Sequence, residues 1–148
     1  MLSLAAARSV FSESTEFLGE FPAADFGTGR FEIPAIQSAL LGAGQSRFCQ
    51  WGVPNSDGVF ALVVAEITPA DRASLIDALS GAGFGSSTSG SVTTLEHEQE
   101  GMISTDAATH LFTGDSWILC DGTSLSLTGE VAHSALTAIR AANPTLGL

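Results

Sequence analysis

The polar segment 91–101 holds the densest group of side chains that could bind a metal ion. Glu96, Glu98 and Glu100 alternate with other residues, so an extended backbone places their carboxylates on one face. His97 then points to the opposite face. Three carboxylates at this spacing can hold a hard cation such as calcium, or can point into solvent and guard a sheet edge. Because no calcium-loop pattern of Asp, Asn and Gly accompanies them, we expect a solvated edge strand and no metal site.

A second group of reactive side chains surrounds a predicted turn. His110 precedes this turn, Asp115 ends it, and Ser116 follows it. A histidine, an acid and a serine are the groups of hydrolytic catalysis, so a small hydrolase that uses His110 or His97 is one hypothesis. Nothing in the spacing fixes a triad, and a structural hydrogen bond between His110 and Asp115 is the simpler interpretation. We therefore predict no catalytic residue, and we expect His133, off the apolar stripe of its helix, at the surface.

Other candidate motifs are incomplete. Gly81, Gly83 and Gly85 follow a predicted helix, whereas a nucleotide-binding loop follows a strand. The chain has no lysine, which excludes a Walker-type phosphate loop. His97 lacks the second histidine of a zinc protease, and Ser124 lacks the closing glycine of a nucleophile elbow. We expect no cofactor.

The two cysteines, Cys49 and Cys120, each lie close to a tryptophan in an apolar, strand-like segment. Their spacing matches no zinc or redox motif, so they form either a disulfide or two buried thiols. A disulfide would close a loop of about 70 residues, would stabilise the fold by roughly 4 kcal/mol, and would indicate an oxidising compartment. We expect Trp51 and Trp117 in the core, with a ligand cleft as the alternative.

These residues must be positioned by an alternation of helices and hairpins. Thr68 is expected to cap a helix that ends at Gly81, with Asp71 as the reciprocal acid of a capping box. The order predicts an α+β fold, an antiparallel sheet of about four to six strands with about three or four helices mainly on one face. The remaining predicted elements are helices at 33–41 and 128–142, hairpins at 48–53 with 59–67 and at 110–112 with 116–120, a flexible connection at 81–90, and an edge strand at 91–101.

The first 32 residues differ from the rest of the chain. Residues 1–32 hold five of the nine phenylalanines, and the gaps between them match neither a helix stripe nor a strand. We expect a Phe-rich arm or helix docked on a single α+β domain at 33–148. The alternative is that these phenylalanines face a partner.

Composition restricts the possible partners. The chain has 148 residues, of which 45% are apolar, and its five arginines against sixteen acids give a net charge of −11. The apolar fraction excludes general disorder, and the acidity argues against nucleic acid and anionic membranes as partners. No apolar run approaches the roughly 18 residues of a membrane span, so we expect no membrane insertion.

The strand Phe48-Cys49-Gln-Trp51, with the short helix before it, resembles small exported or lipid-anchored domains of unknown function in actinobacteria, some of them sensor-like. The resemblance implies a disulfide between Cys49 and Cys120 and an extracytoplasmic location. The first residues do not form a signal peptide, because Arg8 follows the apolar stretch, so export requires a trimmed chain. We expect a non-enzymatic, secreted or envelope-associated binding domain for an unknown protein, peptide or envelope ligand. A cytoplasmic interaction protein with free thiols is a further alternative.

Overall fold

The computed structural model describes residues 2–102 and 104–144, and within them the elements alternate between helices and hairpins. Their order is α1 (Leu4–Val10), β1 (Glu16–Phe21), the 3₁₀ helix η1 (Ala23–Phe26), α2 (Pro34–Gly42), β2 (Gln45–Gly52), β3 (Val59–Glu66), α3 (Pro69–Gly81), β4 (Gly85–Ser89), β5 (Val92–Glu100), β6 (Thr105–Thr113), β7 (Ser116–Gly122) and α4 (Leu125–Ala142). The expected α+β class is confirmed.

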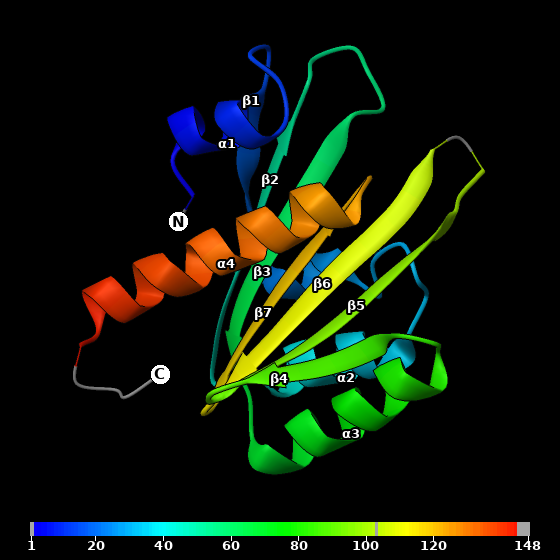
Figure 1. Cartoon of the computed structure of the whole chain (residues 1–148), viewed down its shortest axis with the longest axis vertical. Coiled ribbons are helices and arrows are strands. Elements are labelled where there is room, and N and C mark those ends of the chain that lie inside the picture. The colour runs from blue at the N-terminus through cyan, green and yellow to red at the C-terminus, as the bar shows by residue number, and fades with distance from the viewer. Residues whose placement is uncertain (1, 103, 145–148) are drawn as a thin grey trace.

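One antiparallel sheet of seven strands forms the centre of the protein (Figure 1). Its order is β1-β2-β3-β7-β6-β5-β4, so two consecutive runs of strands meet where β3 pairs with β7. The central strands β3, β6 and β7 are largely buried at both alternating sets of positions. Such strands must be covered on both faces.

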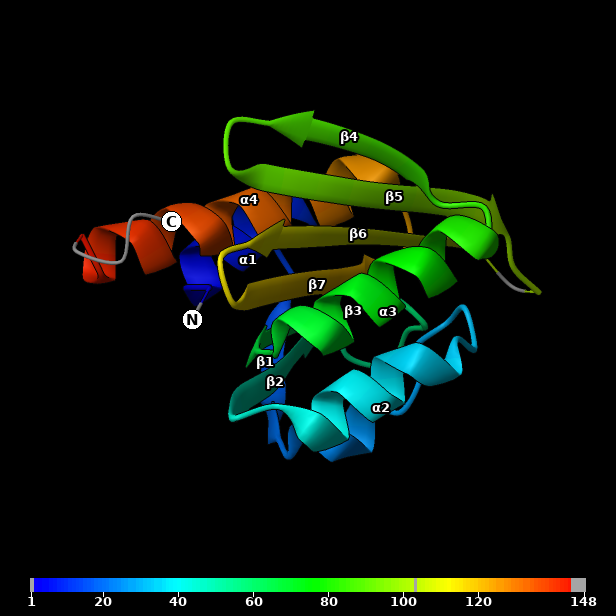
Figure 2. The same ribbon diagram turned by 90° about the horizontal axis from the view of Figure 1, so that it is seen from below.

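Helices cover both faces of the sheet, which corrects the expectation of helices mainly on one face. Figures 1 and 2 show α4 and α1 on one side, with α2 and α3 on the other. Leu62 and Ile118 belong to the core under α4, whereas Val63 and Phe112 belong to the core under α2 and α3. Two apolar faces require two layers of helix, because either face would otherwise expose its side chains to water. Among the described helices, none is long and apolar enough to cross a membrane.

The best-signalled helix and hairpins form where the sequence predicts them. α3 begins after Thr68, whose hydroxyl accepts the Asp71 backbone N–H at 3.1 Å. The Thr68 hydroxyl also donates a hydrogen bond to the Asp71 carboxylate at 2.7 Å. The predicted cap residues are therefore in contact, although the carboxylate accepts from the Thr68 side chain and not from its backbone N–H. The hairpins β2–β3 and β6–β7 are both present.

The sheet has more strands than expected, and β1 is one of those that were missed. β1 lies within the Phe-rich segment 1–32 and pairs with β2. Its register shifts between Phe17 and Gly19, and this bulge moves Phe21 to the opposite face from Phe17. Phe17 packs against Trp51 under α4 and Phe21 against Phe48 on the other face, so the spacing of the phenylalanines shows no period.

The second missed strand is β4, in the segment expected to be a flexible connection. β4 contains only glycine, serine and threonine, and all five of its residues are exposed. It pairs with β5 from Gly85 opposite Glu96 to Ser89 opposite Val92. β5 is therefore an inner strand, and the expectation that it forms the edge is wrong.

The last helix begins three residues earlier than predicted. α4 starts at Leu125, and the Ser124 hydroxyl accepts the backbone N–H of Leu127 at 3.2 Å. The segment 124–127 therefore forms the cap and first turn of α4.

Candidate functional site

Arg30 joins two carboxylates that lie far from it in the sequence. Its Nε–H donates to Asp121 Oδ1 at 2.7 Å, and its backbone N–H donates to Asp121 Oδ2 at 3.0 Å. Its Nη1–H donates to Asp106 Oδ1 at 3.0 Å, and its Nη2–H donates to the carbonyl oxygen of Val59 at 3.1 Å. Four strong contacts from one residue fix the guanidinium between β3, β6 and β7.

The backbone approaches Asp121 closely because Gly29 precedes Arg30. Gly29 has a φ of +67°, and a Cβ atom there would lie 2.8 Å from Asp121 Oδ2 and 2.8 Å from the ring of Phe26. A side chain would therefore push the Arg30 N–H away from its acceptor. Glycine is required here for space as well as for conformation.

Burial gives Asp121 an unusual acidity. Its side chain is 8% exposed. Burial raises the pKa of Asp121 to about 6, the contacts with Arg30 oppose that rise, and the nearby Asp106 adds to it. Both oxygens of Asp121 already accept hydrogen bonds from Arg30. The carboxylate is therefore held in place by Arg30.

An open cavity of about 430 Å³ lies beside this pair. Phe48, at its wall, has its ring centroid 5.5 Å from that of Phe21 and 5.3 Å from that of Phe26. The polar residues that line it include Asp25, Gln50, Arg30 and Asp121. Aromatic rings together with carboxylates form a surface that attracts cations.

His110 is part of the core and not of a catalytic triad. It is completely buried, and the Trp117 Nε1–H donates to its Nδ1 at 3.2 Å. Burial lowers the pKa of His110 to about 3, so the ring is neutral at pH 7. Its Nε2 has no hydrogen-bond partner in the described part of the chain. The rings of Phe84 and His110 are nearly perpendicular, with their centroids 5.3 Å apart. The expected contact with Asp115 is not formed.

His97 and the glutamates lie on opposite faces of β5, as predicted. His97 contacts the rings of Phe31 and Phe84, with centroids 5.4 and 5.2 Å away. On the other face Glu96 Oε1 accepts the Thr109 hydroxyl at 3.2 Å. Glu96 is half-buried, whereas Glu98 and Glu100 are exposed, so this face of β5 is solvated near the end of the strand as predicted, although β5 is not the edge.

Glu98, two residues further along β5, caps the first turn of α4. Glu98 Oε2 accepts the backbone N–H of Leu125 at 2.9 Å, in the first turn of α4. A carboxylate there also complements the positive end of the helix dipole. Across residues 2–102 and 104–144, no three His, Cys, Asp or Glu side chains are grouped so as to hold a metal ion.

The expected disulfide is absent, because Cys49 and Cys120 are both buried, free thiols. Cys49 pairs with Leu62 in the register of β2 and β3, and Leu62 pairs with Cys120 in the register of β3 and β7. The cysteines are thus two strand spacings apart, about 9–10 Å, whereas a disulfide needs Cα atoms within about 7 Å. Burial raises the pKa of both thiols. Export therefore stays a prediction without this support.

The remaining candidates have structural positions. Trp51 and Trp117 are 1% and 0% exposed, which confirms the core interpretation over the ligand cleft. His133 is exposed on α4, as predicted.

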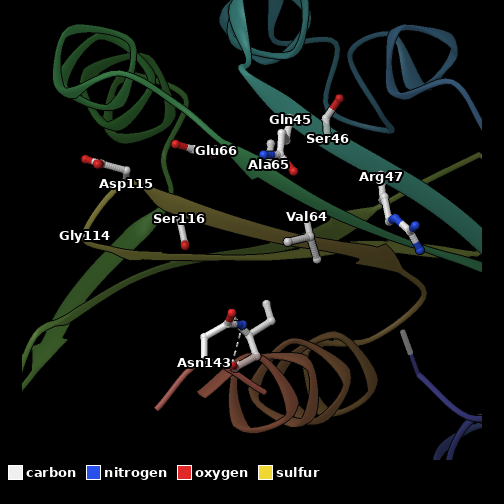
Figure 3. Close-up of a pocket in the computed structure, with 11 residues that line it drawn as sticks. Gln45, Ser46, Arg47, Val64, Ala65, Glu66, Gly114, Asp115, Ser116 and Asn143 are labelled. Atoms are coloured by element: carbon white, nitrogen blue, oxygen red, sulfur yellow. Dashed lines mark hydrogen bonds between the residues drawn. The ribbon is translucent and has the colours of Figure 1, made fainter. Parts of the chain in front are cut away.

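A second, larger cavity of about 560 Å³ lies on the opposite face of the sheet, near the end of α4. Figure 3 shows Val64 facing it from β3, with Arg47 and Ser116 at its sides and Asn143 on the helix side. Its lining contains no buried ionisable group with a shifted pKa, unlike the smaller cavity. We therefore take the cavity beside Asp121 as the candidate functional site.

Comparisons of the chain with protein-family models, with curated proteins and with solved structures found no match.

Sequence reasoning did not find the Arg30 cluster. In the sequence, Asp121 precedes a glycine at the end of an apolar strand, and Asp106 lies in a segment without a periodic pattern, so neither position indicates which residue is the partner. One feature of the sequence could have indicated the contact. Asp121 lies at the end of an apolar strand, and an acid buried there needs a positively charged partner. The chain has only five arginines and no lysine, so few partners are possible.

Proposed function

We propose that the protein is a non-enzymatic binding domain whose ligand carries a cationic group into the cavity beside Asp121. The observation that supports this proposal is the combination of the packed rings of Phe21, Phe26 and Phe48 with carboxylates around one open cavity, next to an arginine whose charge is already paired with Asp121 and Asp106. Three of the five guanidinium N–H groups of Arg30 donate to Asp121, Asp106 and Val59, and its charge is paired with two carboxylates, which disfavours an anionic ligand.

The charge balance of the site favours a cation. Asp25, Asp106 and Asp121 provide three carboxylates against the single guanidinium of Arg30. The chain as a whole has a net charge of −11, so its long-range field also attracts cations. A quaternary or primary ammonium group can bind to the rings while its charge faces Asp25.

The described residues do not favour the hydrolase alternative. His110 is buried against Trp117, and His97 lies between two phenylalanine rings. Neither histidine has a hydrogen bond to a serine or carboxylate within the part of the chain that the structure describes. A general base must reach the proton that it removes, and neither ring is placed to do so. We retain the extracytoplasmic location as a proposal that rests on the sequence resemblance alone.

Calorimetric titration with choline tests the proposal, and its neutral isostere dimethylbutanol provides the ligand control. We expect choline to bind more tightly than the alcohol, and binding to weaken as salt is added. Asp25→Asn should weaken choline binding up to about fivefold, as expected for an exposed ion pair. Asp115→Asn, which removes a carboxylate from the larger cavity, should leave binding unchanged. Equal binding of choline and the alcohol would refute the proposal.

A further inference from the structure

The strand β1 forms an open edge of the sheet. β1 pairs with β2 on one side, and no strand in the described part of the chain pairs with its other side. An edge strand presents unpaired backbone N–H and C=O groups to any extended segment that approaches it. Within Glu16–Phe21 there is no proline or lysine to block such pairing.

Large apolar side chains gather on this edge. Phe17, Leu18 and Phe21 are 43%, 44% and 38% exposed, so three of the six exposed large apolar residues in the described part of the chain lie on one short strand. The opposite edge, β4, contains only glycine, serine and threonine. Both edges can offer backbone groups, but only β1 also offers apolar area to a partner. Exposed apolar surface of this kind marks interaction sites.

The edge leads directly into the candidate functional site. Phe21 ends β1 and lines the cavity, where Asp25 provides a carboxylate. Glu16 and Glu20 add two exposed carboxylates along the same strand. The bulge after Phe17 interrupts pairing in the middle of β1, so the regular end of the strand is the one next to the cavity.

We infer that an extended, basic segment of another protein adds to the sheet along β1 and places a lysine or arginine side chain in the cavity. This inference rests on the proposed cation site and names the carrier of the cation. Strand addition supplies affinity through the backbone, and the pocket supplies specificity through one side chain. A second copy of the chain fits this edge poorly. The carboxylates of Glu16 and Glu20 on one copy would face those on the other, and each copy carries a net charge of −11, so the two copies would repel each other.

Three probes of increasing complexity test the inference on the whole protein. The first is butylammonium, which offers only the cation. The second is a short capped peptide of alternating valine and threonine with one lysine, and the third is the same peptide with backbone N-methylation, which cannot pair as a strand. We expect the unmodified peptide to bind at least about tenfold more tightly than butylammonium, and the methylated peptide to lose that gain.

Protein variants locate the peptide on the edge. Phe17→Ser should weaken peptide binding and leave butylammonium binding unchanged, since Phe17 lies on β1 but does not line the cavity. Leu41→Ser is the matched control, because Leu41 is an exposed apolar residue on α2, away from β1. Thermal unfolding of both variants verifies that they are folded.

Each outcome decides between the two proposals. If butylammonium binds and the peptide binds no more tightly, the strand-addition inference fails and the cation site stands. If neither binds, both proposals fail. If the protein forms a dimer that Phe17→Ser dissociates and the peptide does not bind, the edge is an interface between two copies and the inference is overturned.

Discussion

Replacing Arg30 by methionine should destabilise the protein strongly, and more so at alkaline than at acidic pH. Methionine fills a similar volume but removes the positive charge and the three side-chain hydrogen bonds to Asp121, Asp106 and Val59. The two carboxylates would then lie together without a counter-charge. The Arg30 side chain is 27% exposed and that of Asp121 is 8% exposed, so water compensates this loss only in part.

The expected loss follows from the burial of the pair. Removing one partner of a buried ion pair costs about 3–5 kcal/mol, and the partial exposure of Arg30 favours the lower end, about 3 kcal/mol. For a domain of this size, that loss lowers the melting temperature by roughly 6–12 °C. Arg47→Met is the matched control, because Arg47 is 68% exposed and lies 3.7 Å from Glu20. We expect the control to lose less than about 0.5 kcal/mol.

Acidification should restore part of the stability of Arg30→Met. The pKa of Asp121 in the folded protein is about 6, above the ordinary value of 3.8, so between these values the folded state binds the proton more readily than the unfolded state. Stability linked to Asp121 therefore rises as the pH falls through the folded pKa. Without Arg30 the pKa of Asp121 in the folded protein rises further. Each additional pKa unit adds about 1.4 kcal/mol to the free energy of unfolding that acidification restores.

Urea unfolding of the wild type, Arg30→Met and Arg47→Met at about pH 8 and about pH 5 measures both effects. The double variant Arg30→Met/Asp121→Asn should be more stable than Arg30→Met at pH 8, because it removes the uncompensated charge. Equal losses for the two arginine variants, or a loss independent of pH, would refute this account of the cluster.

Three further predictions test other parts of the fold. The His110 ring has a folded pKa of about 3, below its ordinary 6.5, so the unfolded state takes the proton first and stability linked to His110 falls as the pH drops below 6.5. Between pH 7 and pH 5 the free energy of unfolding of His110→Phe, measured with urea, should therefore rise by about 2 kcal/mol relative to that of the wild type. A difference in unfolding free energy that is the same at both pH values would contradict this prediction. Thiol titration without reductant in denaturant should find both Cys49 and Cys120 free, whereas an absence of titratable thiols would restore the disulfide. Gly29→Ala should lower the melting temperature more than Gly27→Ala, since both have a φ of +67° but only Gly29 would clash with its surroundings, and equal effects would show that space is not limiting.

The sequence predicted the elements whose signals are local. Thr68 and Asp71 are three residues apart, and the β6–β7 hairpin closes over a turn that ends at Asp115. These features need no information about the rest of the chain. The capping of α3 and both main hairpins could therefore be read from short segments.

The features that were missed depend on contacts between distant segments. Arg30 and Asp121 are 91 residues apart, and no periodicity links them. The disulfide prediction was wrong because both cysteines could be placed on strands, but the strand order, with Leu62 between them, could not be derived. β4 was missed because its residues have no apolar pattern, and its pairing with β5 alone makes it a strand.

The cavity beside Asp121 is proposed to bind a cation. Titration of isotope-labelled protein with choline, followed by NMR, locates the ligand directly. The account predicts saturable shifts of the amide signals of Phe21, Phe26 and Phe48, with no comparable shifts for dimethylbutanol. Shifts confined to Val64 and Ser116, in the larger cavity, or no saturable shifts at all, would contradict it.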